Sequence, residues 1–357
     1  MSIYANRPGD PSASNRPLLT IAIPTFNRSG LLAGLLAMLE PQLLQFPQIE
    51  LLISNNASED DTSSVVAATA ERFAALNIPF EFHNHTASLG GDGNFNFCFQ
   101  QARGHFFWLC GDDDFILPGS VAQVIRHLQD PQGNPTEVDI IYATSYGFQN
   151  DYLAERIEDP FHRNFHTIHS AKQFAMIVNI MFTFISSIIV NKQRFEEIPH
   201  ENPSASGVSL IQLSWSLPLL LHFRKGIVLW TRPVAARNGN AHGYNIGEVF
   251  GERLAANVTR LLPNRPDLSA PILNFALRRW FPSVLIDVRS ADNTTLGLDH
   301  AHIGLRRAFG NNPRYWLFTY PALKLPLPAA KLYTKATAVL SKLLYMAHLP
   351  GFWRKQT

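Results

Sequence analysis

Three consecutive aspartates, Asp112, Asp113 and Asp114, directly follow the apolar run FFWLC at 106–110. Adjacent carboxylates repel one another and raise each other's pKa unless a cation neutralises them. Their oxygens suit hard divalent ions such as Mg²⁺ or Mn²⁺, especially when phosphate oxygens complete the shell. A solvated turn or the start of the next helix would use the same residue types. The position directly behind an apolar run favours a metal site at this triplet.

Three other polar stretches follow apolar runs in the same way. Asn27 and Arg28 come after IAIPTF and could hold a ribose and a diphosphate. Asn56 ends LLISNN, and its side-chain amide could pair with the edge of a nucleobase. The loop HNHTASLGGDGN (83–94) could cradle phosphate with its glycines. Turn and capping chemistry explains each stretch equally well when it is taken alone.

An alternation of strand-like and helix-like segments places these stretches. We expect strands at 18–26, 49–56, 79–85 and 105–110, and helices at 29–43, 58–76, 91–102 and 120–129. Ser58 and Asp61 look like a capping box for the second helix. This alternation is typical of a mainly parallel sheet covered by helices on both faces, which is an α/β, Rossmann-like fold. Such sheets bind ligands where their strands end, so the polar stretches should meet at one edge.

The later part of the chain alternates less regularly. We expect strands at 139–148, 184–195 and 226–237, helices at 169–180 and 209–223, and a mostly helical region from 245 to 357. The most apolar stretch, 174–190, is marginal for a membrane span. Asn179 within it favours a buried helix followed by a strand.

Composition and charge limit the class of protein. The chain has 357 residues, of which 46% are hydrophobic and 16% charged, so it is long enough for a large core. Its two cysteines, Cys98 and Cys110, form neither a disulfide framework nor a zinc site, which indicates a reducing, cytoplasmic compartment. Residues 1–17 are too polar for a signal peptide and predict a flexible tail.

The C-terminal region carries an uneven charge. No acidic residue follows Asp299, whereas nine basic residues do: Arg306, Arg307, Arg314, Lys324, Lys331, Lys335, Lys342, Arg354 and Lys355. Basic segments with interfacial aromatics lie on anionic membrane surfaces. A helical cap with its lysines in water is the alternative. Nucleic acid is disfavoured, because the basic residues are spread among apolar ones.

Taken in order, four motifs resemble the nucleotide-sugar-dependent glycosyltransferases of family 2, which have the GT-A fold. The motifs are IAIPTFNR (21–28), ISNNASEDDT (53–62), the GGDGN loop (90–94) and WLCGDDDFILPGS (108–120). The segments 184–195 and 231–240 resemble the abequosyltransferase-like bacterial branch, which adds deoxysugars to lipopolysaccharide repeat units. The resemblance implies a GT-A domain at 18–244, with a nucleotide-binding half at 18–130 and an acceptor half at 131–244.

The resemblance also implies roles for individual residues. Asn56 takes the position that contacts the nucleobase, where many relatives have Asp. The three aspartates can be aligned with the metal-binding motif of relatives in two registers. Asp114 is the first choice for the metal ligand, because it belongs to both registers. Asp112 is its partner in one register and Asp113 in the other. The remaining residues assigned to the nucleotide, diphosphate and sugar are Pro24, Thr25, Arg28, Asp92 and Asn94.

The position of the catalytic base departs from the family pattern. Inverting relatives carry an acidic base at the start of a downstream helix, but the corresponding stretch here is HENPSASGVSLIQLSW (200–215). Glu201 or His200 would have to supply the base from the preceding loop. Arg237, Asn238, Asn240 and His242 follow the last core strand, where a loop could close over the diphosphate.

The resemblance predicts a Mn²⁺- or Mg²⁺-dependent, inverting glycosyltransferase. It would move a sugar from a nucleoside diphosphate to a glycan, such as a lipid-linked surface polysaccharide, at the cytoplasmic face of the inner membrane. A nucleotidyltransferase would also need a carboxylate-bound metal, but PTFNRSG (24–30) lacks the expected Gly-rich basic loop. A non-catalytic, membrane-associated scaffold with a degenerate pocket is the other alternative.

Overall fold

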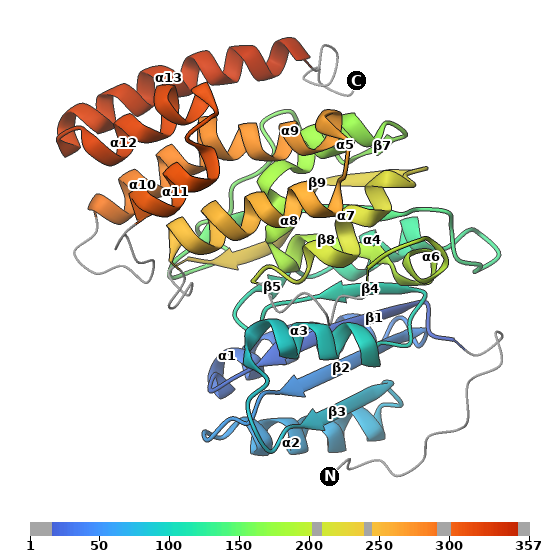
Figure 1. Ribbon diagram of the computed structural model, residues 1–357. Coiled ribbons are helices and arrows are strands. Elements are labelled where there is room, and N and C mark those ends of the chain that lie inside the picture. Colours follow the sequence, from blue (N-terminus) through green and yellow to red (C-terminus); the bar gives the residue numbers. More distant parts are fainter. Residues whose placement is uncertain (1–15, 202–208, 239–244, 291–300, 349–357) are drawn as a thin grey trace.

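A nine-stranded sheet forms the centre of the protein (Figure 1). The computed structural model describes residues 16–201, 209–238, 245–290 and 301–348. The strands lie in the order β3-β2-β1-β4-β8-β6-β9-β5, and β7 also pairs with β9. Their bounds are β1 (Leu19–Thr25), β2 (Ile49–Asn55), β3 (Phe80–Asn84), β4 (Phe106–Leu109), β5 (Phe115–Ile116), β6 (Ile140–Phe148), β7 (Phe165–Ile168), β8 (Ile188–Asn191) and β9 (Gly226–Arg237).

The N-terminal half of the sheet is parallel, as the alternation predicts. Strand β1 pairs in parallel with β2 and with β4, and β2 pairs in parallel with β3. The register sets Thr25 beside Asn55, and Asn55 beside Asn84, at the ends of their strands. The polar residues that follow these strands therefore meet at one edge.

The other half makes the sheet mixed rather than mainly parallel. Strand β8 runs antiparallel to β4 and β6, and β9 runs antiparallel to β5 and β7 while pairing in parallel with β6. The expected strand at 184–195 is shorter than predicted. The short 3-10 turn η3 (Ile185–Ser187) precedes β8, and the helix α6 (Lys192–Glu197) follows it. The stretch 174–190 is thus a buried helix and strand, as expected.

Helices cover both faces of the sheet (Figure 1). Alternate residues of β1 separate the two cores: Leu19, Ile21 and Ile23 pack with α1, α2 and α4, whereas Ala22 belongs to the core on the α3 side. Those helices are α1 (Ser29–Leu43), α2 (Thr62–Ala75), α3 (Gly90–Gln101) and α4 (Ser120–Leu128). Further helices add residues to the α3-side core: α5 (Ala171–Val178), η2 (Asn179–Thr183), α7 (Leu213–Leu221), η5 (Ile246–Arg253), α8 (Leu254–Leu261), α9 (Pro266–Phe275), η6 (Ala276–Trp280), α10 (Phe281–Ser290), α11 (Ala301–Phe309), η7 (Tyr315–Thr319) and α12 (Tyr320–Lys324). The last helix, α13 (Leu327–His348), packs against α10, α12 and η6.

The predicted capping box at Ser58 and Asp61 is wrong. Asp60 accepts hydrogen bonds from the backbone N–H and the hydroxyl of Thr62, where α2 begins. Ser58 accepts instead from the backbone N–H of Asn27. The loop before α2 is therefore tied to the end of β1, so tertiary contact replaces the local cap.

Two expectations concern the ends of the chain. Most of the predicted tail lies outside the described residues, but Arg16 donates to the carbonyl of Arg103 at 2.7 Å and is held against the domain. Among the described residues, no helix is both long and apolar enough to cross a membrane.

Candidate active site

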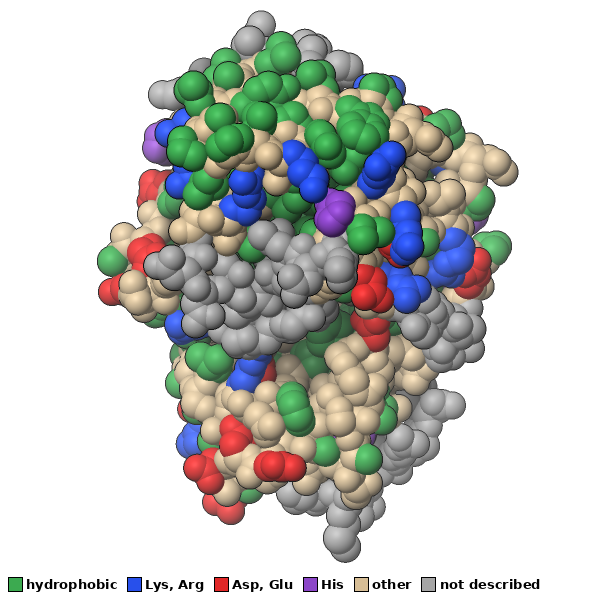
Figure 2. Space-filling view, turned by 60° about the vertical axis from the view of Figure 1, so that its left-hand side comes forward, with side chains coloured by type: hydrophobic (Ala, Val, Ile, Leu, Met, Phe, Trp, Pro, Cys, Tyr) green, Lys and Arg blue, Asp and Glu red, His purple; other side chains and the backbone are tan. Residues whose placement is uncertain are grey.

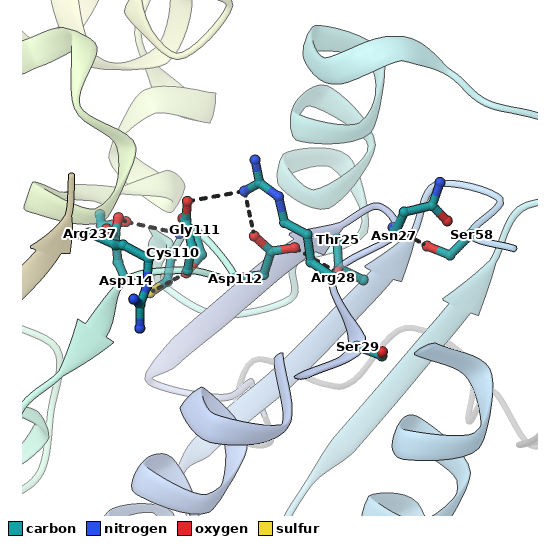
Figure 3. Close-up of polar contacts among 12 residues, drawn as sticks. Thr25, Asn27, Arg28, Ser29, Ser58, Cys110, Gly111, Asp112, Asp114 and Arg237 are labelled. Atoms are coloured by element: carbon teal, nitrogen blue, oxygen red, sulfur yellow. Dashed lines mark hydrogen bonds and ion pairs between the residues drawn. The ribbon is translucent and has the colours of Figure 1, made fainter. Parts of the chain in front are cut away.

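The site lies where the parallel strands end (Figure 3). Strand β1 delivers Thr25 and Arg28, and the chain leaving β4 delivers the three aspartates. The backbone N–H of Cys110 donates to the carbonyl of Ala22 at 2.9 Å, which carries the β1–β4 pairing to the start of the triplet. The aspartates therefore face the end of β1, as the sequence predicts.

A cavity of about 500 Å³ opens at this edge. It is lined by Pro24, Thr25, Phe26, Arg28, Asn56, Gly91, Asn94, Phe95, Gly111, Asp112, Asp113, Asp114, Phe184, Ile185 and Arg237. Most of the residues predicted from the sequence are among them. A cavity of this size, with apolar walls and a few convergent polar groups, is typical of a small-molecule site.

Asp112 and Asp113 both pair with the guanidinium of Arg28. The hydroxyl of Thr25 donates to Oδ2 of Asp112 at 2.7 Å, and the Arg28 guanidinium contacts Oδ1 of Asp112 at 3.0 Å and Oδ2 of Asp113 at 3.1 Å. Asp112 is buried. Burial raises the pKa of Asp112 to about 6, although Arg28 and Thr25 act in the opposite direction. The charge of Asp112 is therefore only partly compensated.

Asp114 is held by partners other than Arg28, which come from η3 and from the end of β9 (Figure 3). Its Oδ2 accepts from the hydroxyl of Ser186 at 2.5 Å, and its Oδ1 accepts from the backbone N–H of Arg237 at 3.1 Å. Burial raises the pKa of Asp114 well above its usual range, and the neighbouring Asp113 raises it further. This carboxylate thus links the end of β4 to η3 and to the end of β9.

Gly111 makes this arrangement possible. Its backbone N–H donates to the Ser186 hydroxyl at 2.9 Å. A Cβ at this position would meet Oδ1 of Asp113 at 2.9 Å and Oδ2 of Asp114 at 3.1 Å. A side chain at this position would therefore displace the carboxylate oxygens from where they lie.

The carboxylates suit a divalent cation that arrives with phosphate. Two of the three adjacent carboxyls are buried and have raised pKa values, so Arg28 alone does not stabilise three negative charges at this position. Among the described residues, no three His, Cys, Asp or Glu side chains form a ready metal-binding group. Mg²⁺-type sites commonly use one or two carboxylates and take their other ligands from water and phosphate. The residues present fit such a site.

Arg237 presents a positive charge to the same cavity. Its guanidinium lies 4.7 Å from the Phe148 ring centre and 5.8 Å from that of Phe115, within the range of cation–π attraction. Its Nε is buried and has no hydrogen-bond partner within the described part of the chain. A buried donor of this kind suits an anionic ligand in the cavity.

The three asparagines assigned to the ligand also organise the backbone. Asn27 adopts a left-handed φ of 53°, and its Oδ1 accepts from the backbone N–H of Glu59. Oδ1 of Asn56 accepts from Leu89 N–H at 2.7 Å, at the start of α3. Asn94 bonds to Ser54 through both ends of its amide. Asn56 and Asn94 line the cavity, but Asn27 does not.

The candidates for the catalytic base do not line the cavity. Glu201 is exposed and pairs with Arg260. The His200 ring contacts the Phe195 ring at a tilt, with Nδ1 2.8 Å from the carbonyl of Ile198. His242, like Asn240, lies outside the described residues.

Asp92 lies in the first turn of α3, between cavity-lining residues. Its Oδ1 accepts from the backbone N–H of Ile211 at 3.3 Å, just before α7, and burial raises its pKa. It sits next to Gly91, which lines the cavity. Asp92 itself is not among the residues that line the cavity, and its Oδ1 is bound to the segment before α7.

Sequence reasoning missed the contribution of η3. Phe184 and Ile185 line the cavity, and the Ser186 hydroxyl joins Gly111 to Asp114. The backbone of Ser186 is fixed in turn, because the Trp108 indole N–H donates to its carbonyl at 2.8 Å. The resemblance of 184–195 to a family segment was the only signal in the sequence.

The sequence of this chain is similar to those of known glycosyltransferases. Residues 20–198 match the family model described as glycosyl transferase family 2. The abequosyltransferase RfbV of Salmonella typhimurium is 24% identical over 295 residues, which cover 79% of this chain and 84% of that protein. A GalNAc(5)-diNAcBac-PP-undecaprenol beta-1,3-glucosyltransferase of Campylobacter jejuni is 32% identical over 110 residues, which cover 31% of this chain and 34% of that protein.

Solved structures confirm the fold. S. aureus TarS superimposes with a TM-score of 0.57 and 18% identity, covering 89% of this chain and 53% of that chain. Its 1–349 fragment in complex with UDP-GlcNAc gives a TM-score of 0.56 and 16% identity, covering 92% of each chain.

Proposed function

Because this chain belongs to glycosyl transferase family 2, we propose that it transfers a sugar from a nucleoside diphosphate to a hydroxyl of a glycan, with a divalent cation at the aspartate triplet. The observation that carries the proposal is the group of three carboxylates at the sheet edge, beside a buried Arg237 Nε without a partner among the described residues. Carboxylates for a cation and a guanidinium for phosphate are what a nucleotide-sugar diphosphate requires.

Asp112 and Asp114 would hold the cation. Mn²⁺ and Mg²⁺ both suit this position, because both prefer oxygen ligands. When bound, it would neutralise charge on the departing diphosphate. Arg237 would contact the same diphosphate from the end of β9, and Arg28 from the end of β1. Pro24, Thr25 and Asn56 would line the nucleotide side of the cavity, with Asp113 and Asn94 beside the diphosphate and sugar.

The transfer needs a base as well as a leaving-group site. The acceptor oxygen forms a bond to the anomeric carbon, the bond from that carbon to the diphosphate breaks, and the acceptor proton passes to the base. A single displacement of this kind inverts the anomeric centre. Asp92 is our first candidate, since it is half-buried, has a raised pKa and adjoins the cavity. Glu201 and His200 are the other candidates.

The names of two relatives support a proposal for the acceptor and the location. The Campylobacter relative is named for an undecaprenol-linked substrate, and the Salmonella relative for transfer of abequose. These names support a lipid-linked surface-polysaccharide intermediate as the acceptor. We therefore place the protein at the cytoplasmic face of the inner membrane, where such an intermediate would be within reach.

Turnover tests the proposal. A panel of nucleotide sugars is incubated with the protein and with membranes that contain lipid-linked glycans, in Mn²⁺ or in chelator, and release of nucleoside diphosphate is measured. We expect one donor to be consumed in Mn²⁺ only, and Asp112→Asn to abolish its consumption. Asp61→Asn is the matched control, because Asp61 is exposed and lies outside the cavity. Equal turnover by Asp112→Asn and the wild type would refute the assigned site.

A further inference from the structure

The last helix, α13, exposes large apolar side chains to solvent. Leu332 is 72% exposed, Val339 63% and Leu340 48%, and Ala336 between them is also exposed. Their spacing of four, seven and eight residues places them along one face of the helix. This face is a continuous apolar stripe rather than a scatter of single residues.

The side of α13 that faces the protein carries small residues instead. Ala330 and Ser341 are buried, and the Thr334 hydroxyl is buried too. This helix packs against α10, α12 and η6. A helix that packs only against its own domain in water turns its leucines inward. As far as Ser341, where its side chains are described, α13 does the reverse, so its outer face is built for an apolar environment.

Basic side chains border the apolar stripe. Lys331 and Lys335 are exposed one turn apart, next to the stripe, and Lys324 is exposed at the end of α12. The neighbouring short π-helix η7 exposes Trp316 and Leu317, and the hydroxyl of Tyr333 on α13 donates to the carbonyl of Leu317 at 2.8 Å. From residue 300 onward the sequence contains no acidic residue.

Figure 2 shows these features on one end of the molecule. Hydrophobic side chains gather over the end formed by the C-terminal helices, and Lys and Arg side chains run along its border. An apolar patch rimmed by positive charge complements a bilayer with anionic headgroups, where lysines meet the headgroups and the leucines enter the acyl boundary.

We propose that the outer face of α13, together with η7, is a docking surface for an anionic lipid bilayer. Leu332, Val339, Leu340, Trp316 and Leu317 enter the interface, and Lys331 and Lys335 contact the phosphates. The purpose of this surface rests on the proposed function, since it would bring the site to a lipid-linked acceptor. The binding itself does not depend on catalysis.

Vesicle binding tests this inference without an activity assay. The full chain is sedimented with vesicles of phosphatidylcholine alone, or with one third phosphatidylglycerol, at low and high salt. We expect binding to the anionic vesicles that weakens as salt rises. Lys331→Gln with Lys335→Gln should reduce the affinity about 30-fold, because each basic residue near the surface contributes about five-fold.

A second pair of variants tests the apolar stripe. Leu332→Ser with Leu340→Ser should reduce the affinity at least about tenfold, since burial of each leucine is lost. Leu153→Ser with Ile157→Ser is the matched control, because both are exposed apolar residues of another segment. Thermal melting should be unchanged in the three double variants, which checks that they are folded.

Three results would overturn the proposal. The first is equal binding of neutral and anionic vesicles, and the second is an equal loss of binding in the control and the stripe variants. The third is a dimer in sedimentation velocity that Leu332→Ser with Leu340→Ser abolishes, with no binding to vesicles, which would assign the stripe to a second copy of this chain. Because none of these measurements involves a sugar, a failed turnover assay would leave the result standing.

Discussion

Replacing Ser186 by alanine should destabilise the protein and weaken its site together. The Ser186 hydroxyl donates to Asp114 and accepts from the backbone N–H of Gly111, and all three residues line or adjoin the cavity. The variant loses a hydrogen bond to a carboxyl group and leaves a buried N–H unsatisfied, each costing about 1–3 kcal/mol. We expect a loss of about 2–4 kcal/mol in the free energy of unfolding, and weaker Mn²⁺-dependent binding of nucleoside diphosphate.

Ser187 supplies a matched control in the next position. It is equally buried, but its hydroxyl has no hydrogen-bond partner among the described residues. Ser187→Ala should therefore change the free energy of unfolding by less than about 0.5 kcal/mol, or stabilise the protein. Chemical denaturation gives the stabilities, and calorimetry gives the nucleotide affinities. If Ser186→Ala and Ser187→Ala are equally stable and bind nucleotide equally well, the role assigned to Ser186 is wrong.

Two further predictions concern carboxyl groups with raised pKa values. Asp92→Asn should lower kcat about 10²–10⁴-fold, because a general base is lost, and should retain nucleotide binding. Glu201→Gln and His200→Asn should each change kcat by less than about threefold. A larger effect of either variant would show that the base is that residue. Burial raises the pKa of Glu50 to about 7, so the folded state binds more protons than the unfolded state between pH 4.5 and 7 and stability falls as pH rises through that window. Glu50→Gln should thus be more stable than the wild type by about 2–3 kcal/mol at pH 8, and the difference should vanish below pH 4.5. Chemical denaturation of both proteins at pH 8 and below pH 4.5 measures this difference. A difference in stability that does not depend on pH would contradict the prediction.

The parallel half of the sheet and its binding edge were predictable from the sequence. Strands β1 and β2 are short apolar runs that end in a polar residue, and successive strands are separated by a helix. The order of elements therefore fixes the edge at which Thr25, Asn56 and Asp112 meet. Local pattern was sufficient because the connections are short and because β1, β2 and β4 are buried on both faces.

The antiparallel half was not predictable in the same way. Strand β8 inserts between β4 and β6, far from its place in the sequence, and β5 has only two residues. No local periodicity specifies such pairings. The role of Ser186 was not predictable from the sequence either. It depends on contacts with Gly111 and Asp114, which are more than 70 residues away in the chain.

The roles of polar side chains were also only partly predictable. Residue type and position predicted that Asn56 and Asn94 lie at the cavity. Each also forms hydrogen bonds with the backbone or side chain of a neighbouring element. An amide serves a turn and a ligand equally well, so the sequence alone does not separate these uses.

Calorimetric titration with nucleoside diphosphates, in the presence and absence of Mn²⁺, tests the central claim most directly. The wild type should bind one nucleotide tightly in Mn²⁺ and weakly in chelator. Asp114→Asn should lose the metal-dependent part, provided its melting curve shows a folded protein, and Asp61→Asn should retain it. Binding of no nucleotide under either condition, or metal-dependent binding that survives in Asp114→Asn and Asp112→Asn alike, would contradict a nucleotide-sugar site at the aspartate triplet.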